Sequence, residues 1–64
     1  MKFREYDGVI LNTDKYEKDG FLKGMTGTIV EVYDDVTFEV DFTNYGNEFL
    51  FMSFKEDDLL PLSL

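Results

Sequence analysis

The stretch that decides the fold is TIVEVYDDVTFEVDF, residues 28–42. Its two halves are rich in β-branched and aromatic residues, and they alternate apolar with polar side chains, which is typical of half-buried β-strands. The acidic pair Asp34-Asp35 separates the halves and indicates a turn. We therefore expect an antiparallel hairpin with strands over residues 28–33 and 36–42.

The alternation also predicts the register of this hairpin. If the valines of the first strand share the core face with Phe38, the loop must have an odd length, because a slip of one residue turns every side chain over. A three-residue loop over residues 34–36 satisfies this condition and takes Val36 out of the strand. The expected pairs are Val32 with Phe38, Val30 with Val40, Glu31 with Glu39 and Ile29 with Asp41.

The opposed glutamates have two interpretations. Like charges directly across a sheet destabilise it by a few tenths of a kcal/mol, so the chain can be reserving Glu31 and Glu39 for a cation on a partner. The alternative is that both side chains splay into solvent at little cost.

Weaker strand patterns flank the hairpin. We expect strands over residues 6–11, 48–54 and 59–62, a long polar loop over residues 12–22, and a single helical turn over residues 55–58. Together these elements predict a single domain, residues 1–64, that is all-β: a small five-stranded SH3-like barrel with a long first loop and one short 3-10 turn before the last strand.

The core follows from the positions whose alternation is clearest. Strand 48–54 is apolar on both faces, so either the barrel curls enough to bury both or an aromatic patch with Phe49 and Phe51 is exposed. The residues expected to share the core are Val9, Leu11, Val30, Val32, Phe38, Val40, Phe42 and Leu62.

Composition excludes several classes of function. The 64 residues contain neither cysteine nor histidine, which removes disulfides, the usual general base and the common zinc ligand sets. Residues 14–20 hold acids and two lysines without the alternating spacing of a calcium loop. We expect no catalytic residues, no metal and no cofactor. No apolar run is long enough for a membrane span or a signal peptide, so we expect a cytoplasmic protein without membrane contact.

The charge is concentrated in one part of the chain. Residues 1–24 carry five acids and five bases, whereas residues 25–64 carry nine acids and Lys55 as the single base, so the net charge of −8 belongs to the second segment. Because that segment also holds the clearest strands, the acids are expected on a rigid face that favours a basic partner. Net charge also keeps a small domain soluble, which is the simpler interpretation.

Residues 23–30, KGMTGTIV, resemble the glycine-centred turn and strand of KOW motifs in SH3-like barrels. Such barrels bind RNA or RNA polymerase, and binding to phosphate requires lysines and arginines. Here the strands that would present the face carry Glu31, Glu39, Asp41 and Glu48. We therefore expect no direct contact with nucleic acid.

A longer resemblance covers nearly the whole chain and rests on Tyr6-Asp7-Gly8-Val9, the glycine turn with its strand, Val40 with Phe42, and Leu59-Leu60-Pro61-Leu62. It is similar to a group of small bacterial SH3-like domains of uncharacterised function. Similar domains are found beside toxin genes as candidate antitoxins or immunity proteins. The resemblance implies the fold, and it raises toxin neutralisation as a candidate function.

These observations lead to a functional hypothesis. We expect a non-enzymatic immunity protein, monomeric when free, that presents an acidic face to the basic active site of a toxin domain, a nuclease (ribonuclease) of a contact-dependent inhibition or polymorphic-toxin system. The alternative is an accessory SH3-like module that binds a protein or peptide. The expected partner-binding residues are Glu31, Tyr33, Asp34, Asp35, Glu39, Asp41, Tyr45, Glu48, Phe49 and Phe51.

Overall fold

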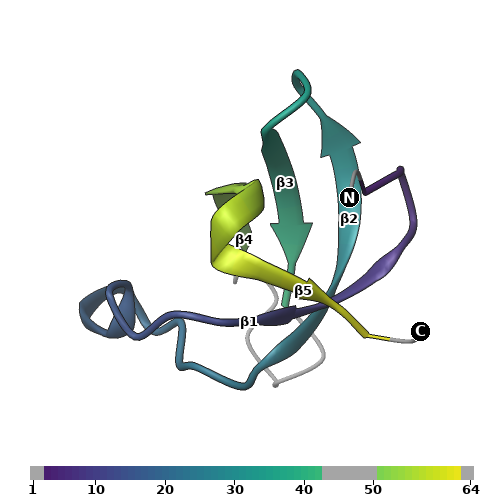
Figure 1. The fold of residues 1–64 in the computed structure, drawn as a ribbon. Helices are drawn as coiled ribbons and strands as arrows, with labels where there is room; N and C mark the ends of the chain where they lie inside the picture. Colours follow the sequence, from purple (N-terminus) through teal and green to yellow (C-terminus); the bar gives the residue numbers. More distant parts are fainter. Residues whose placement is uncertain (1–2, 43–50, 63–64) are drawn as a thin grey trace.

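The computed structural model describes residues 3–42 and 51–62. Within them, five antiparallel strands form one sheet in the order β4-β3-β2-β1-β5 (Figure 1). Two 3-10 turns accompany the strands: η1 lies in the long first loop, and η3 joins β4 to β5. The elements are β1 (Gly8–Leu11), η1 (Glu17–Asp19), β2 (Thr26–Val32), β3 (Thr37–Asp41), β4 (Phe51–Lys55), η3 (Glu56–Asp58) and β5 (Leu59–Pro61).

The sheet is barrel-like. Its two edge strands, β4 and β5, are separated in the chain only by the three residues of η3, so the sheet must curl to bring its edges near each other (Figure 1). The all-β class, the long first loop and the 3-10 turn before the last strand are confirmed. The first strand begins at Gly8 instead of residue 6, because a turn over residues 4–7 holds Tyr6 at a left-handed φ of 73°.

A β-bulge in β2 corrects part of the predicted register. Glu31 pairs with Glu39 and Val32 with Phe38 as expected, but the register then shifts between Ile29 and Glu31. Val30 is the extra residue of the bulge. Consequently Ile29 faces Val40 and Thr28 faces Asp41, so the predicted pairs Val30–Val40 and Ile29–Asp41 are wrong.

The core differs from the expected one at three positions. Val30 is only half-buried because the bulge turns it out of the core, and Ile29 is fully buried in its place. Val32 and Leu62 were also predicted inside, but they lie at strand ends and are 38% and 50% exposed. The buried hydrophobic residues are Phe3, Val9, Leu11, Phe21, Met25, Ile29, Phe38, Val40, Phe42, Phe54 and Leu59, which confirms Val9, Leu11, Phe38, Val40 and Phe42.

The glycine turn before β2 has two distinct requirements. Gly24 adopts φ 97°, a conformation that other residues rarely take. At Gly27 an added Cβ would lie 2.7 Å from the Asp41 carbonyl oxygen and 2.7 Å from the Phe42 ring. The two glycines of the KOW-like motif are therefore explained by the fold itself.

The long first loop is folded onto the core by aromatic residues. Phe21 is buried and its ring lies 5.3 Å from that of Phe54 and 5.7 Å from that of Phe42. Tyr16 packs edge-on against Phe54 at 5.0 Å. Edge-to-face ring pairs of this kind add to the stabilisation from burial.

A buried carboxylate fixes the same loop to η3. Asp58 is only 3% exposed, and its Oδ2 accepts hydrogen bonds from the Tyr16 hydroxyl at 2.8 Å and the Lys55 backbone N–H at 3.1 Å. Its Oδ1 lies 3.0 Å from Lys15 Nζ. We call this group, Lys15, Tyr16, Lys55 and Asp58, the Asp58 clamp.

The clamp holds Asp58 in its charged form. Burial by itself would raise the pKa of the Asp58 carboxyl, but the hydrogen bonds from Tyr16, Lys15 and the Lys55 backbone outweigh burial and lower that pKa. The sequence gave no sign of this contact, because its members are 42 residues apart in the chain.

Candidate protein-binding site

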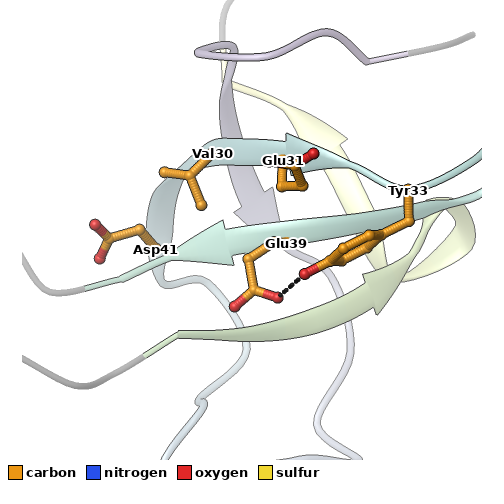
Figure 2. Close-up of a pocket in the computed structure, with 5 residues that line it drawn as sticks. All are labelled: Val30, Glu31, Tyr33, Glu39 and Asp41. Atoms are coloured by element: carbon orange, nitrogen blue, oxygen red, sulfur yellow. Dashed lines mark hydrogen bonds between the residues drawn. The ribbon is translucent and has the colours of Figure 1, made fainter.

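The opposed glutamates lie at the centre of a shallow concavity on the outer face of β2 and β3 (Figure 2). Glu31 is exposed and Glu39 half-buried, and they are paired directly across the two strands. We call this site the acidic concavity. It is lined by Val30, Glu31, Tyr33, Glu39 and Asp41.

The bulge explains why an apolar residue lines an otherwise acidic site. A bulge places two residues of one strand opposite a single residue of the next, so that strict alternation is interrupted. Val30 therefore joins Glu31 in lining the concavity instead of entering the core. A site with an apolar element between carboxylates can contact both the stem and the charged end of a long basic side chain.

Hydrogen bonds orient the carboxylate of Glu39. The Tyr33 hydroxyl donates to Glu39 Oε1 over 3.0 Å, as Figure 2 shows, and Ser53 Oγ on β4 donates to the same oxygen over 3.2 Å. The bond to Glu39 also raises the pKa of the Tyr33 hydroxyl, with smaller effects from burial. Glu39 is thus held in place by residues of three successive strand regions.

The turn between β2 and β3 is also fixed by a carboxylate. Asp34 Oδ1 accepts the backbone N–H of Val36 at 2.9 Å, and this bond holds the pKa of the Asp34 carboxyl below its usual value. Asp34 therefore serves the turn as well as the acidic surface. Asp35 is exposed beside it.

The structure brings six of the predicted partner-binding residues together around the β2–β3 hairpin: Glu31, Tyr33, Asp34, Asp35, Glu39 and Asp41. Tyr45, Glu48 and Phe49 lie outside the described residues. For Phe51 the structure gives the backbone, which pairs with Asp41 at the start of β4.

Sequence reasoning missed two residues of the site. Val30 was assigned to the core, since a bulge leaves no mark in a regular run of β-branched residues. Ser53 was overlooked, although a single hydroxyl within the apolar run of residues 49–54 is a signal of a polar contact on that strand.

The chemistry available to this face is that of carboxylates and one tyrosine. Among residues 3–42 and 51–62 no group of three or more acidic side chains is arranged to hold a metal ion. In the same part of the chain, no helix has the length and apolar character needed to cross a membrane. An open face of fixed carboxylates suits the binding of cationic groups.

Fold and site together define a small all-β domain with an acidic binding face. The chain matches the family model described as Domain of unknown function (DUF4926) over residues 5–60, and it belongs to that family. Neither the curated proteins nor the solved structures contain a match to it.

Proposed function

We propose that this protein is an immunity protein of the cytoplasm that neutralises a nuclease toxin of a contact-dependent inhibition or related polymorphic-toxin system. The observation that carries the proposal is the acidic concavity, in which three carboxylates are held on paired strands. The SH3-like resemblance of the sequence, with its candidate immunity proteins, agrees with this role.

The proposed mechanism is electrostatic mimicry. A nuclease site must be basic in order to hold phosphate, and fixed carboxylates at Glu31, Glu39 and Asp41 present negative charge in the same way. Because Tyr33 and Ser53 already orient Glu39, little side-chain freedom is lost when the complex forms. The inhibitor then occupies the site without undergoing any reaction.

Association by this mechanism is steered by charge. The Debye length is about 10 Å at 0.1 M salt, so added salt should slow association much more than it speeds dissociation. Stopped-flow measurements over a range of salt concentrations test this. An association rate independent of salt would favour the accessory protein-binding module instead.

The decisive experiment uses the protein encoded by the neighbouring gene as the candidate toxin. Wild-type protein should block its RNA cleavage, and Glu31→Lys and Glu39→Lys should each weaken the complex by bringing like charge to a basic site. Asp14→Lys is the matched control, because it makes the same charge change on the first loop. Equal losses for all three variants would mean that only total charge matters and would contradict a specific site.

A further inference from the structure

The tip of the β2–β3 hairpin exposes apolar side chains next to the acidic concavity. Val32, Tyr33 and Val36 are 38%, 56% and 47% exposed. Val36 also lines a second concavity, whose other walls are Lys55, Glu56 and Asp57 of β4 and η3. We call Val32–Val36 the hairpin tip. It therefore stands between two concavities, with Tyr33 lining one and Val36 lining the other.

The hairpin tip is held in one conformation by its backbone. The N–H of Val36 donates to Asp34, and its carbonyl accepts the N–H of Glu56 at 2.8 Å. The N–H of Tyr33 donates to the Thr37 carbonyl at 3.0 Å. An apolar surface that is already ordered costs little entropy to bind, in contrast to a mobile loop.

The charges around the tip select the partner. Acidic residues surround it on the turn and on η3, namely Asp34, Asp35, Glu56 and Asp57. The one base lining the second concavity, Lys55, donates its Nζ to Thr37 Oγ1 at 2.9 Å. A second copy of this chain carries a net charge of −8 and would bring acids against these acids. A basic segment is the complementary occupant.

We propose that the hairpin tip seats an apolar side chain of a basic protein segment, flanked there by arginines or lysines. The inference rests on the proposed function and extends it: the acidic concavity receives a cationic side chain, while Val36 and the second concavity receive the apolar anchor next to it. Apolar anchors inside a polar rim are the arrangement that concentrates binding energy at protein interfaces.

Two capped pentapeptides test the anchor directly, Arg-Arg-Leu-Arg-Arg and Arg-Arg-Gly-Arg-Arg. In NMR titrations the leucine peptide should bind about fivefold more tightly, as expected for partial burial of one leucine. It should also shift the amide signals of Val36 and Glu56, whereas the glycine peptide should mainly shift those of Glu31 and Glu39.

Variants separate this inference from the proposed function. Val36→Ser should abolish the preference for leucine and leave binding of the glycine peptide unchanged. Leu60→Ser is the matched control, because Leu60 is 44% exposed on β5 and its replacement should leave the preference intact. Glu39→Lys should weaken binding of both peptides.

The outcomes are distinguishable. Equal affinity for the two peptides, or a leucine preference that survives Val36→Ser, would overturn the anchor site alone. Inhibition of the toxin that is insensitive to Glu39→Lys would overturn the proposed function. Val36→Ser with weaker toxin binding and an unchanged melting temperature would support the anchor in the natural complex.

Discussion

Tyr16 and Tyr33 each donate a hydrogen bond to a carboxylate, over 2.8 Å and 3.0 Å, but the two pairs lie in different surroundings. The acceptor of Tyr16 is Asp58, which is buried beneath the first loop, whereas the Tyr33–Glu39 pair lies on the outer face of the sheet. A buried group that loses its partner pays the cost of desolvation, while an exposed one exchanges its partner for water. The same bond therefore stabilises the fold at Asp58 and orients a binding surface at Glu39.

The largest contrast is expected when each carboxylate is removed. Asp58→Ala should lower the free energy of unfolding by about 2 to 4 kcal/mol, because Tyr16 and the Lys55 N–H lose a charged acceptor. Glu39→Ala should cost less than about 1 kcal/mol, since it also relieves the repulsion with Glu31. Urea unfolding of both variants measures this, and similar losses would break the distinction between the two regions.

A second contrast concerns acid. Because the folded protein lowers the pKa of Asp58, the stabilisation from the clamp is fully present above the ordinary pKa of about 4 and is lost as the pH falls through the lower folded value. The difference in unfolding free energy between wild type and Asp58→Asn should therefore shrink below about pH 4. A difference that stays constant down to pH 2 would show that the charge of Asp58 does not stabilise the clamp.

Removal of the hydroxyls alone gives a smaller effect. Tyr16→Phe should cost about 1 to 2 kcal/mol and raise the pKa of Asp58, because one of the hydrogen bonds that lower it is gone. Tyr33→Phe should leave both quantities unchanged and instead weaken partner binding. Carbon-13 titration of the Asp58 carboxyl, with Tyr33→Phe as the control, distinguishes the two tyrosines.

The two regions also differ in how far the sequence predicted them. The period-2 pattern around Phe38 fixed which face of β3 is buried, and the parity of the loop placed Glu31 opposite Glu39. Alternation reports local geometry, so it was sufficient for a site built from neighbouring strands.

Local patterns were insufficient in two other places. The bulge at Val30 conflicts with the alternation from which it would have to be inferred, and the prediction failed there. The Asp58 clamp depends on Tyr16 and Asp58 meeting across the barrel, and the acidic run of residues 56–58 looked like an exposed turn. Contacts between distant segments follow from the closed fold, which a pattern along the chain does not contain.

The smallest effect should be seen in the titration of Tyr33. Its pKa is raised because the hydroxyl donates to Glu39, so stabilisation from this bond is present below about pH 10 and is lost as the pH rises through the raised value. Glu39→Gln removes the negative charge of the acceptor, and the pKa of Tyr33 should then fall towards its ordinary value. The pKa of Tyr16, which is raised first by burial and then by Asp58, should not change. Site-resolved NMR titration of the two rings measures both values in one experiment. If Glu39→Gln left the pKa of Tyr33 where it was, the bond would not persist in solution, and Glu39 would reach its partner without the orientation that the acidic concavity provides.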